Sequence, residues 1–363
     1  MNPDIIIPTT SSIPVDWSVF TVLLLVTFII HIWMMNVMLG TGIIALARHF
    51  DQKRQDTDLS QTIASHLPFT IAFTINFGVA PLLFLQVLYG HLMYTSSILI
   101  AVYWLSVIGV LILAYYSAYI YDFKYDALAQ KRIFFIGATV IGLLWIAFVF
   151  TNNMTLMLAP EKWHVYFKNA GGLWLNLSEK TLLPRYFHFI IASIAIGGLA
   201  IALYRQIQID KSCDSSQISL WNDDIQSGLN WFIGASLVQM IVGVWYFLSL
   251  PEHVRQLFMG NHTFGTTIFL LAIPLIVLML VGGVKNNVWM VASLLVPVTV
   301  IMVLMRHLVR TACLFPYFKV QDLMVTKQYG PFLCFIVALI AGSAVIIYMI
   351  RLTFTHLVKT QDH

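Results

Sequence analysis

Long apolar stretches alternate with short polar ones along the whole chain. Most of the apolar stretches are about 20 residues or longer, the length that a helix needs to cross roughly 30 Å of hydrocarbon. Continuous apolar runs exclude the alternating pattern of a membrane β-barrel, and backbone groups in lipid must be satisfied within helices. We therefore predict an all-α, polytopic membrane helical bundle with about nine transmembrane helices. The predicted helices are 15–48, 66–92, 96–122, 133–159, 182–206, 226–250, 264–284, 287–312 and 331–355.

The composition agrees with an integral membrane protein. Hydrophobic residues make up 59% of the 363 residues and charged residues 10%, whereas soluble domains carry about 25% charged residues. Because no long repeat or low-complexity tract occurs, we expect a single domain over 1–363. The polar segment 209–224 is predicted to be a flexible connection between two helices. No basic patch with interleaved aromatics is present, so nucleic acid is not an expected partner.

The ends and loops of the apolar runs predict how the chain is processed and oriented. The first run lacks a positively charged leader and a small-residue cleavage site, so we expect it to be retained as a helix. If the N-terminus lies outside, eleven of the twenty Lys and Arg residues lie on the inner side. The tightest basic loops are among them, so we expect a multi-pass protein of the prokaryotic cytoplasmic membrane with its N-terminus outside.

Ionisable residues inside the predicted spans are histidines and not carboxylates. All sixteen acidic residues can be placed at helix ends, in loops or at the termini, whereas His31 lies in the middle of a span. His188 and His307 lie inside or at the outer end of two further spans. An ionisable group in a membrane indicates function, and neutral imidazole is the commonest metal ligand. We therefore expect bound metal, most simply haem iron, rather than proton-driven transport.

The histidines differ in how strongly their surroundings favour iron ligation. Apolar residues flank His31 for about three turns in each direction, and small residues follow His188. For both we favour iron ligation over a hydrogen bond between helices. His307 lies between Arg306 and Arg310, where snorkelling or pairing with haem propionates competes with ligation.

The other possible ligands are less specific. His91 and His262 stay open, and Met305 is more simply explained by packing than by axial ligation. The remaining histidines lie at helix ends or in loops and are set aside: His49, His66, His164, His253, His356 and His363. The cysteines Cys213, Cys313 and Cys334 form no CxxC or CxxCH motif, so any haem would be held non-covalently.

Four segments, in order, resemble subunit I of the cytochrome bd quinol oxidases. They are FIIHIWMMNVMLGTGIIALAR at 28–48, NFGVAPLLFLQVLYG at 76–90, TNNMTLMLAP at 151–160 and RYFHFIIASIAIGG at 185–198. The resemblance implies nine spans, an outer N-terminus and haems near the outer face. It also implies that His31 and His188 are haem ligands, the latter of a low-spin haem b.

The chain departs from that family at several functional positions. The segment 98–123 supplies no carboxylate before Asp122, although the family has two on its proton path. Leu304 stands where the family places a Glu ligand, with His307 or Met305 as the nearest substitutes. The long quinol-binding loop is replaced by the short segment 248–264, where Met259 or His262 could replace a missing Met ligand.

We therefore expect a haem b subunit that carries electrons between a membrane quinol pool and a partner redox protein, such as a cytochrome c, together with other membrane subunits. The implied cofactors are one to three haem b groups, with haem d as an alternative that the resemblance allows, and quinol is the implied substrate. One alternative is a divergent bd-type quinol:oxygen oxidoreductase in which His307 replaces the Glu ligand. The other is a non-redox transporter or membrane anchor whose histidines hydrogen-bond between helices.

Overall fold

The computed structural model describes residues 6–50, 58–168, 170–211 and 215–359, so Cys213 and His363 lie outside the described residues. Within these ranges nine helices are long and apolar enough to cross a membrane. They are α1 (Trp17–Arg48), α2 (Asp58–Leu99), α3 (Ala101–Phe123), α5 (Arg132–Met157), α6 (Leu182–Lys211), α7 (Ser215–Ser249), α9 (Thr263–Val284), α10 (Val288–Leu314) and α11 (Tyr329–Lys359).

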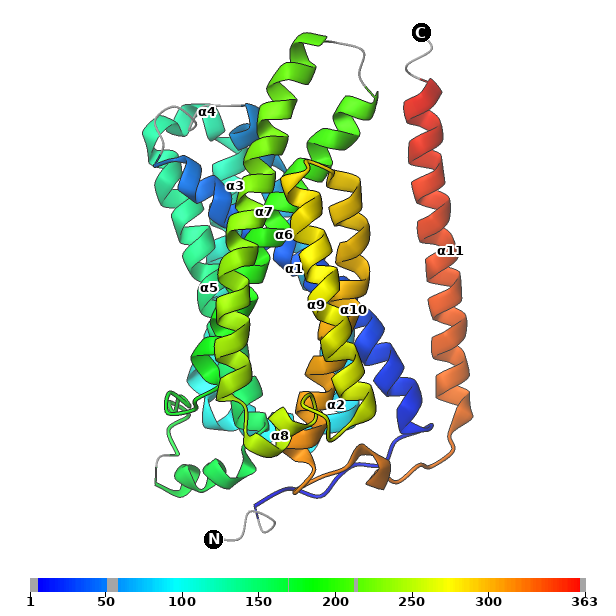
Figure 1. Ribbon diagram of the computed structural model, residues 1–363. Helices are drawn as coiled ribbons and strands as arrows, with labels where there is room; N and C mark the ends of the chain where they lie inside the picture. Colours follow the sequence, from blue (N-terminus) through cyan, green and yellow to red (C-terminus); the bar gives the residue numbers. More distant parts are fainter. Residues whose placement is uncertain (1–5, 51–57, 169, 212–214, 360–363) are drawn as a thin grey trace.

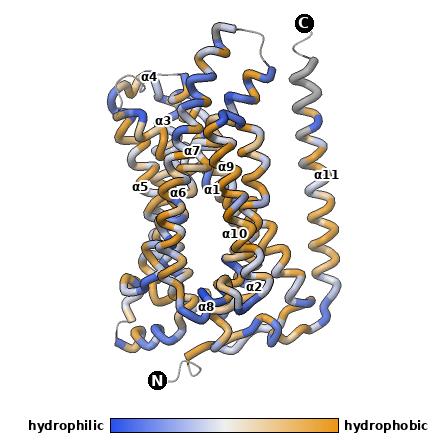
Figure 2. The backbone as a smooth tube through the Cα atoms, viewed as in Figure 1, coloured by the Kyte–Doolittle hydropathy of each residue, from blue (hydrophilic) through white to orange (hydrophobic). Residues whose placement is uncertain are grey.

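The prediction of an all-α bundle is confirmed. Short helices join the long ones: α4 (Tyr125–Leu128), α8 (Glu252–Gln256) and the 3-10 helices η2 (Ala129–Lys131), η3 (Pro160–Phe167) and η4 (Val320–Asp322). Apolar residues fill the middle of the bundle, and polar residues concentrate toward its two ends (Figure 2). We call the end that carries α8 and the segment 158–181 the N-terminal end, because the chain also begins there (Figure 1).

Helix α2 is longer than the predicted span 66–92. Pro68 and Pro81 lie inside it, and the backbone leaves helical geometry at Tyr89 (φ −130°, ψ 22°) before the helix resumes. The predicted span placed His91 at the end of a helix. In the structure His91 lies just after a kink, and the helix continues for two further turns beyond it. The kink was not predictable from composition, because no Pro occurs at Tyr89 itself.

The prediction of a flexible connection at 209–224 is wrong for most of that segment. Helix α6 runs to Lys211 and α7 begins at Ser215, so only residues 212–214 lie outside the described residues. The two helices project as a pair beyond the rest of the bundle (Figure 1). Asp224 consequently lies inside α7, where its carboxylate accepts a hydrogen bond from Arg205 at 3.0 Å.

Helices α1 and α6 pack with their backbones in contact. A Cβ atom at Gly40 would overlap the carbonyl oxygen of Ser193, and one at Gly197 would lie 2.5 Å from the carbonyl carbon of Gly40. Ser193 also donates a hydrogen bond of 2.8 Å to the side chain of Asn36. Small residues at such positions let membrane helices approach closely. These contacts fix how the two helices are aligned.

Helix α11 stands apart from the other helices (Figure 1), and none of the residues in its apolar window is buried. The segment before it is tied to the start of the chain, because the amide of Ile13 donates to the carbonyl of Met324 at 2.8 Å. The rings of Phe84 and Phe335 are 6.2 Å apart and connect α11 to α2.

An ion pair holds the segment between α5 and α6. Lys162 contacts Glu179 at 2.5 Å, and it also donates to the side chain of the buried Asn176 at 3.2 Å. Burial alone raises the pKa of Glu179. The hydrogen bond and charge of Lys162, with two hydrogen bonds from Thr181, outweigh this effect and hold the pKa below its ordinary value of 4.5.

This lowered pKa predicts an acid-sensitive segment. Stabilisation by Glu179 is complete above its ordinary pKa of 4.5 and is lost as the pH falls through the lower value of the folded state. We expect wild type to unfold at a higher temperature than Glu179→Gln at pH 7, and the difference to shrink below about pH 4. Thermal unfolding in detergent between pH 7 and pH 3 measures this. A difference that stays constant over that range would contradict the assignment.

Candidate functional site

His31 lies in the middle of α1 and is held by α2. Its Nδ1 atom is 3.2 Å from the backbone carbonyl oxygen of Thr74. A carbonyl oxygen only accepts, so Nδ1 carries the proton and the lone pair of the neutral ring is on Nε2. Gly78 lies against the same ring, because a Cβ atom there would be 2.9 Å from the Cε1 atom of His31. Helix α2 therefore both orients the imidazole and leaves room for it.

His188 lies in the second turn of α6 and is held by α7. Its Nδ1 atom is 2.9 Å from the side-chain nitrogen of Gln239, and its ring centroid is 5.8 Å from that of Tyr246. A Cβ atom at Gly243 would be 3.8 Å from the Cε1 atom of His188, so this glycine lies at the imidazole edge. Neither His31 nor His188 uses Nε2 in a hydrogen bond to any residue that the structure describes.

The register of α1 and α6 places the two imidazoles at the same level. Asn36 meets Ser193 and Gly40 meets Gly197, which is an offset of 157 residues in each case (193 − 36 and 197 − 40), and His31 and His188 differ by the same 157. Their neighbours nevertheless differ, because His31 contacts α2 whereas His188 contacts α7. The two histidines therefore lie in separate settings, and we expect them to act as separate ligands rather than as one pair.

An arginine lies close to each imidazole, across an aromatic ring. The guanidinium carbon of Arg306 is 4.4 Å from the ring centroid of Phe28, whose ring is 6.3 Å from that of His31. Arg185 lies 5.6 Å from the ring of Tyr246, which neighbours His188. Each of the two sites thus contains an imidazole, an aromatic ring and a guanidinium group.

A third arginine, Arg310, is buried with only 4% of its surface exposed. Its guanidinium lies 4.9 Å from the ring of Tyr89, and its Nη2 atom donates to Nδ1 of His307 at 3.2 Å. Its Nε and Nη1 atoms, and the Nε atom of Arg185, are buried and have no hydrogen-bond partner among the described residues. Among the described residues no carboxylate pairs with Arg185, Arg306 or Arg310.

At the opposite end of the bundle, a buried arginine does have carboxylate partners. Arg205, only 1% exposed, is paired with Asp58 at 2.6 Å and with Asp224 at 3.0 Å. A buried charge without a partner costs several kcal/mol, so the fold supplies carboxylates for Arg205. The arginines near the histidines have none within the described part of the chain, which favours an anionic ligand as their partner.

The remaining predicted ligands lie elsewhere or are already engaged. His307 accepts from Arg310 through Nδ1, so its proton is on Nε2 and that atom cannot bind iron in this tautomer. His262 is exposed and caps α9 by accepting a hydrogen bond from Gly265 at 3.0 Å. Met305 is partly buried and packs against two clusters of buried apolar side chains, and Met259 is 65% exposed.

His91, which the sequence left open, has the most unusual setting of these residues. Its Nε2 atom is buried and has no hydrogen-bond partner in the described part of the chain, and its ring centroid is 4.6 Å from that of Phe318. His91 follows the kink at Tyr89, and the buried hydroxyl of Tyr89 likewise has no partner among these residues. His91 is therefore a third imidazole that is able to bind iron.

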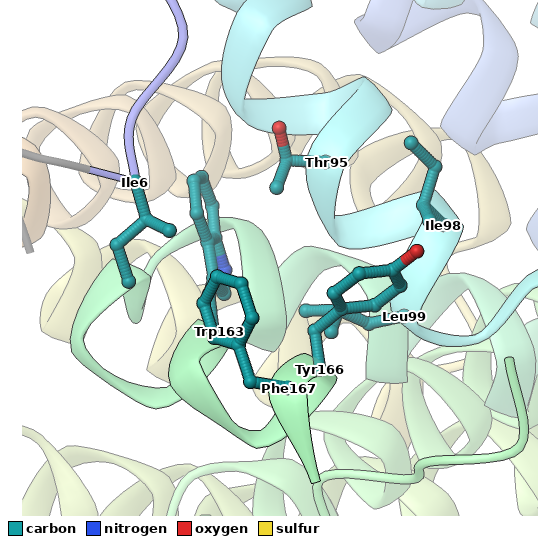
Figure 3. Close-up of a pocket in the computed structure, with 7 residues that line it drawn as sticks. All are labelled: Ile6, Thr95, Ile98, Leu99, Trp163, Tyr166 and Phe167. Carbon is teal, nitrogen blue, oxygen red and sulfur yellow. The ribbon is translucent and has the colours of Figure 1, made fainter. Parts of the chain in front are cut away.

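The pocket shown in Figure 3 does not contain this chemistry. It has a volume of about 250 Å³ and is lined mainly by apolar and aromatic side chains, among them Trp163, Tyr166 and Phe167 of η3. Its Thr95 hydroxyl donates to the carbonyl of His91, and the Trp163 ring nitrogen donates to that of Leu156, so these two polar groups are already used. Neither Thr95 nor Trp163 therefore provides this pocket with a ligand or an acid–base group.

Two features of these residues suit a haem. His31 presents Nε2 in the tautomer that binds iron. His188 has the Gln239 amide at Nδ1, and its Nε2 is free for iron when the amide oxygen faces Nδ1 and accepts the ring proton. Arginines without carboxylate partners suit propionates. Within the described residues no group of three or more His, Cys, Asp or Glu could hold a bare metal ion. Haem iron needs only one or two axial ligands from protein.

Comparison with known proteins gives no family for this chain. No family model matches it, and no curated protein matches it. The resemblance to cytochrome bd subunit I therefore stays a prediction from short motifs, and function rests on the site itself.

Proposed function

We propose that this chain is a haem b subunit of a respiratory membrane complex, resembling subunit I of the cytochrome bd oxidases. It carries electrons between membrane quinol and a partner redox protein such as a cytochrome c. In this proposal the N-terminal end of the bundle faces outside across a prokaryotic cytoplasmic membrane, which puts His188 and the three arginines near the outer face.

One observation carries the proposal: His31 and His188 each lie near an arginine that has no carboxylate partner among the described residues. His31 is connected to Arg306 through Phe28, and His188 to Arg185 through Tyr246. A transporter or anchor that used its histidines only for hydrogen bonds between helices would gain nothing from uncompensated guanidinium groups nearby. A haem uses both groups at once, because it has an iron and two carboxylates.

The residues of this chain then have defined roles. His31 and His188 would each bind one iron through Nε2, and Arg185, Arg306 and Arg310 would hold propionates. When bound, a haem supplies an iron that takes up and releases one electron at a time. Phe28 lies beside the ring of His31 and Tyr246 beside that of His188, and Thr74 and Gln239 orient the imidazoles.

A quinol:oxygen oxidoreductase is the second candidate, and His91 favours it. An oxygen-reducing centre needs a further haem with an open coordination position, and the unpartnered Nε2 of His91 could bind that iron. The sequence had assigned this role to His307, whose Nδ1 contact with Arg310 disfavours it. The two candidates differ in whether oxygen is consumed.

Anaerobic reduction of the purified protein by a soluble quinol tests the proposal. We expect absorption bands of reduced haem b, which oxidised cytochrome c or another one-electron acceptor then removes. When oxygen is then admitted, we expect the reduced protein not to consume it rapidly. Sustained oxygen uptake would favour the oxidoreductase, and a spectrum without any haem band would exclude both.

A further inference from the structure

Helix α7 presents three residues to the ring of His188 from one face. Gln239, Gly243 and Tyr246 are spaced by four and three residues, which places them on one side of a helix. The amide of Gln239 meets Nδ1, Gly243 lies at the edge of the ring, and the ring of Tyr246 lies 5.8 Å away, tilted by 38°. A polar amide in the apolar sequence SLVQMIVGV has a cost in lipid, so its position against the imidazole needs a reason.

The amide end that faces His188 decides which ring nitrogen is free. If the amide nitrogen donates to Nδ1, the ring proton is on Nε2, which then cannot bind iron. If the amide turns by half a rotation, its oxygen accepts the Nδ1 proton and Nε2 is free. The Oε1 atom of Gln239 is buried and has no hydrogen-bond partner among the described residues, so the rotation breaks no hydrogen bond of this atom.

We propose that Gln239 is a positioning residue that keeps the proton of His188 on Nδ1 and sets the strength of Nε2 as an iron ligand. This inference rests on the proposed function. His31 differs, because the Thr74 carbonyl that holds it belongs to the backbone and cannot turn. The chain therefore adjusts one imidazole through a side chain and the other through the backbone.

Two substitutions of Gln239 should move the midpoint potential of the same haem in opposite directions. Gln239→Glu offers a carboxylate, which accepts the Nδ1 proton more strongly, makes Nε2 more basic, stabilises ferric iron and lowers the potential. Gln239→Leu removes the acceptor, so the potential should rise and haem affinity should fall by about 10- to 100-fold. The haem on His31 is the internal control in each variant.

Spectroelectrochemical titration of the whole protein measures both potentials, and transfer of haem to apomyoglobin measures affinity. Gln226→Leu is the matched control, because Gln226 lies on the same helix, is exposed and bonds only Asn230 at 3.1 Å. Opposite shifts confined to the His188 haem support the inference. Equal shifts of both haems, or no shift in either variant, overturn it while leaving the haem proposal intact. Wild-type protein without haem overturns both.

Discussion

A His188→Ala variant is expected to lose one haem b absorption band completely and to keep a second, whereas His31→Ala is expected to lose the second and keep the first. The two imidazoles are at the same level but contact different helices, so each should hold its own haem. Low-temperature reduced-minus-oxidised spectra of the purified variants measure the bands.

Two controls separate loss of a ligand from loss of the fold. His164→Ala should leave both bands unchanged, because His164 is exposed and contacts only the carbonyl of Glu161. Each variant should also elute in size-exclusion chromatography as wild type does. If both bands persist in both variants, the histidines are packing residues and the iron ligands lie elsewhere.

The second large effect is expected from a single methyl group between α1 and α6. Gly40→Ala places a Cβ atom against the Ser193 carbonyl, which is backbone and cannot rotate away, so the helices must separate or slide. We expect a loss of about 3 kcal/mol or more, at the upper end of overpacking costs. Both haem bands should weaken together, because His31 and His188 lie on the two helices that this contact joins.

Gly109→Ala is the matched control, since a Cβ atom there would meet nothing within 4 Å. Thermal unfolding in detergent, followed by haem release, compares the two variants. Equal stability of Gly40→Ala and Gly109→Ala would contradict the close approach of α1 and α6.

The number and type of helices could be predicted because a membrane requires long apolar runs, and these are visible in the chain. The residues at which the helices begin and end were harder to predict. Polar residues at 209–224 resemble a loop, yet the described ones, 209–211 and 215–224, belong to two helices, and Asp224 among them pairs with Arg205. The kink at Tyr89 was not predicted either, because no Pro lies at that position.

The site was predicted in part. His31 and His188 could be selected because histidine is costly inside an apolar run. Gln239 was missed, although an amide in such a run gives the same kind of signal. The difference between Arg310 and Arg205 could not be predicted, because both are single arginines near the end of an apolar run. Only the folded chain shows that one has carboxylate partners while the other has none among the described residues.

The most direct test is the ratio of haem b to polypeptide in the purified protein, measured by the pyridine haemochrome assay with quantitative amino-acid analysis. Two haem b groups per chain, one for His31 and one for His188, is the predicted result. A ratio of zero, in protein that elutes as a folded species, would contradict it.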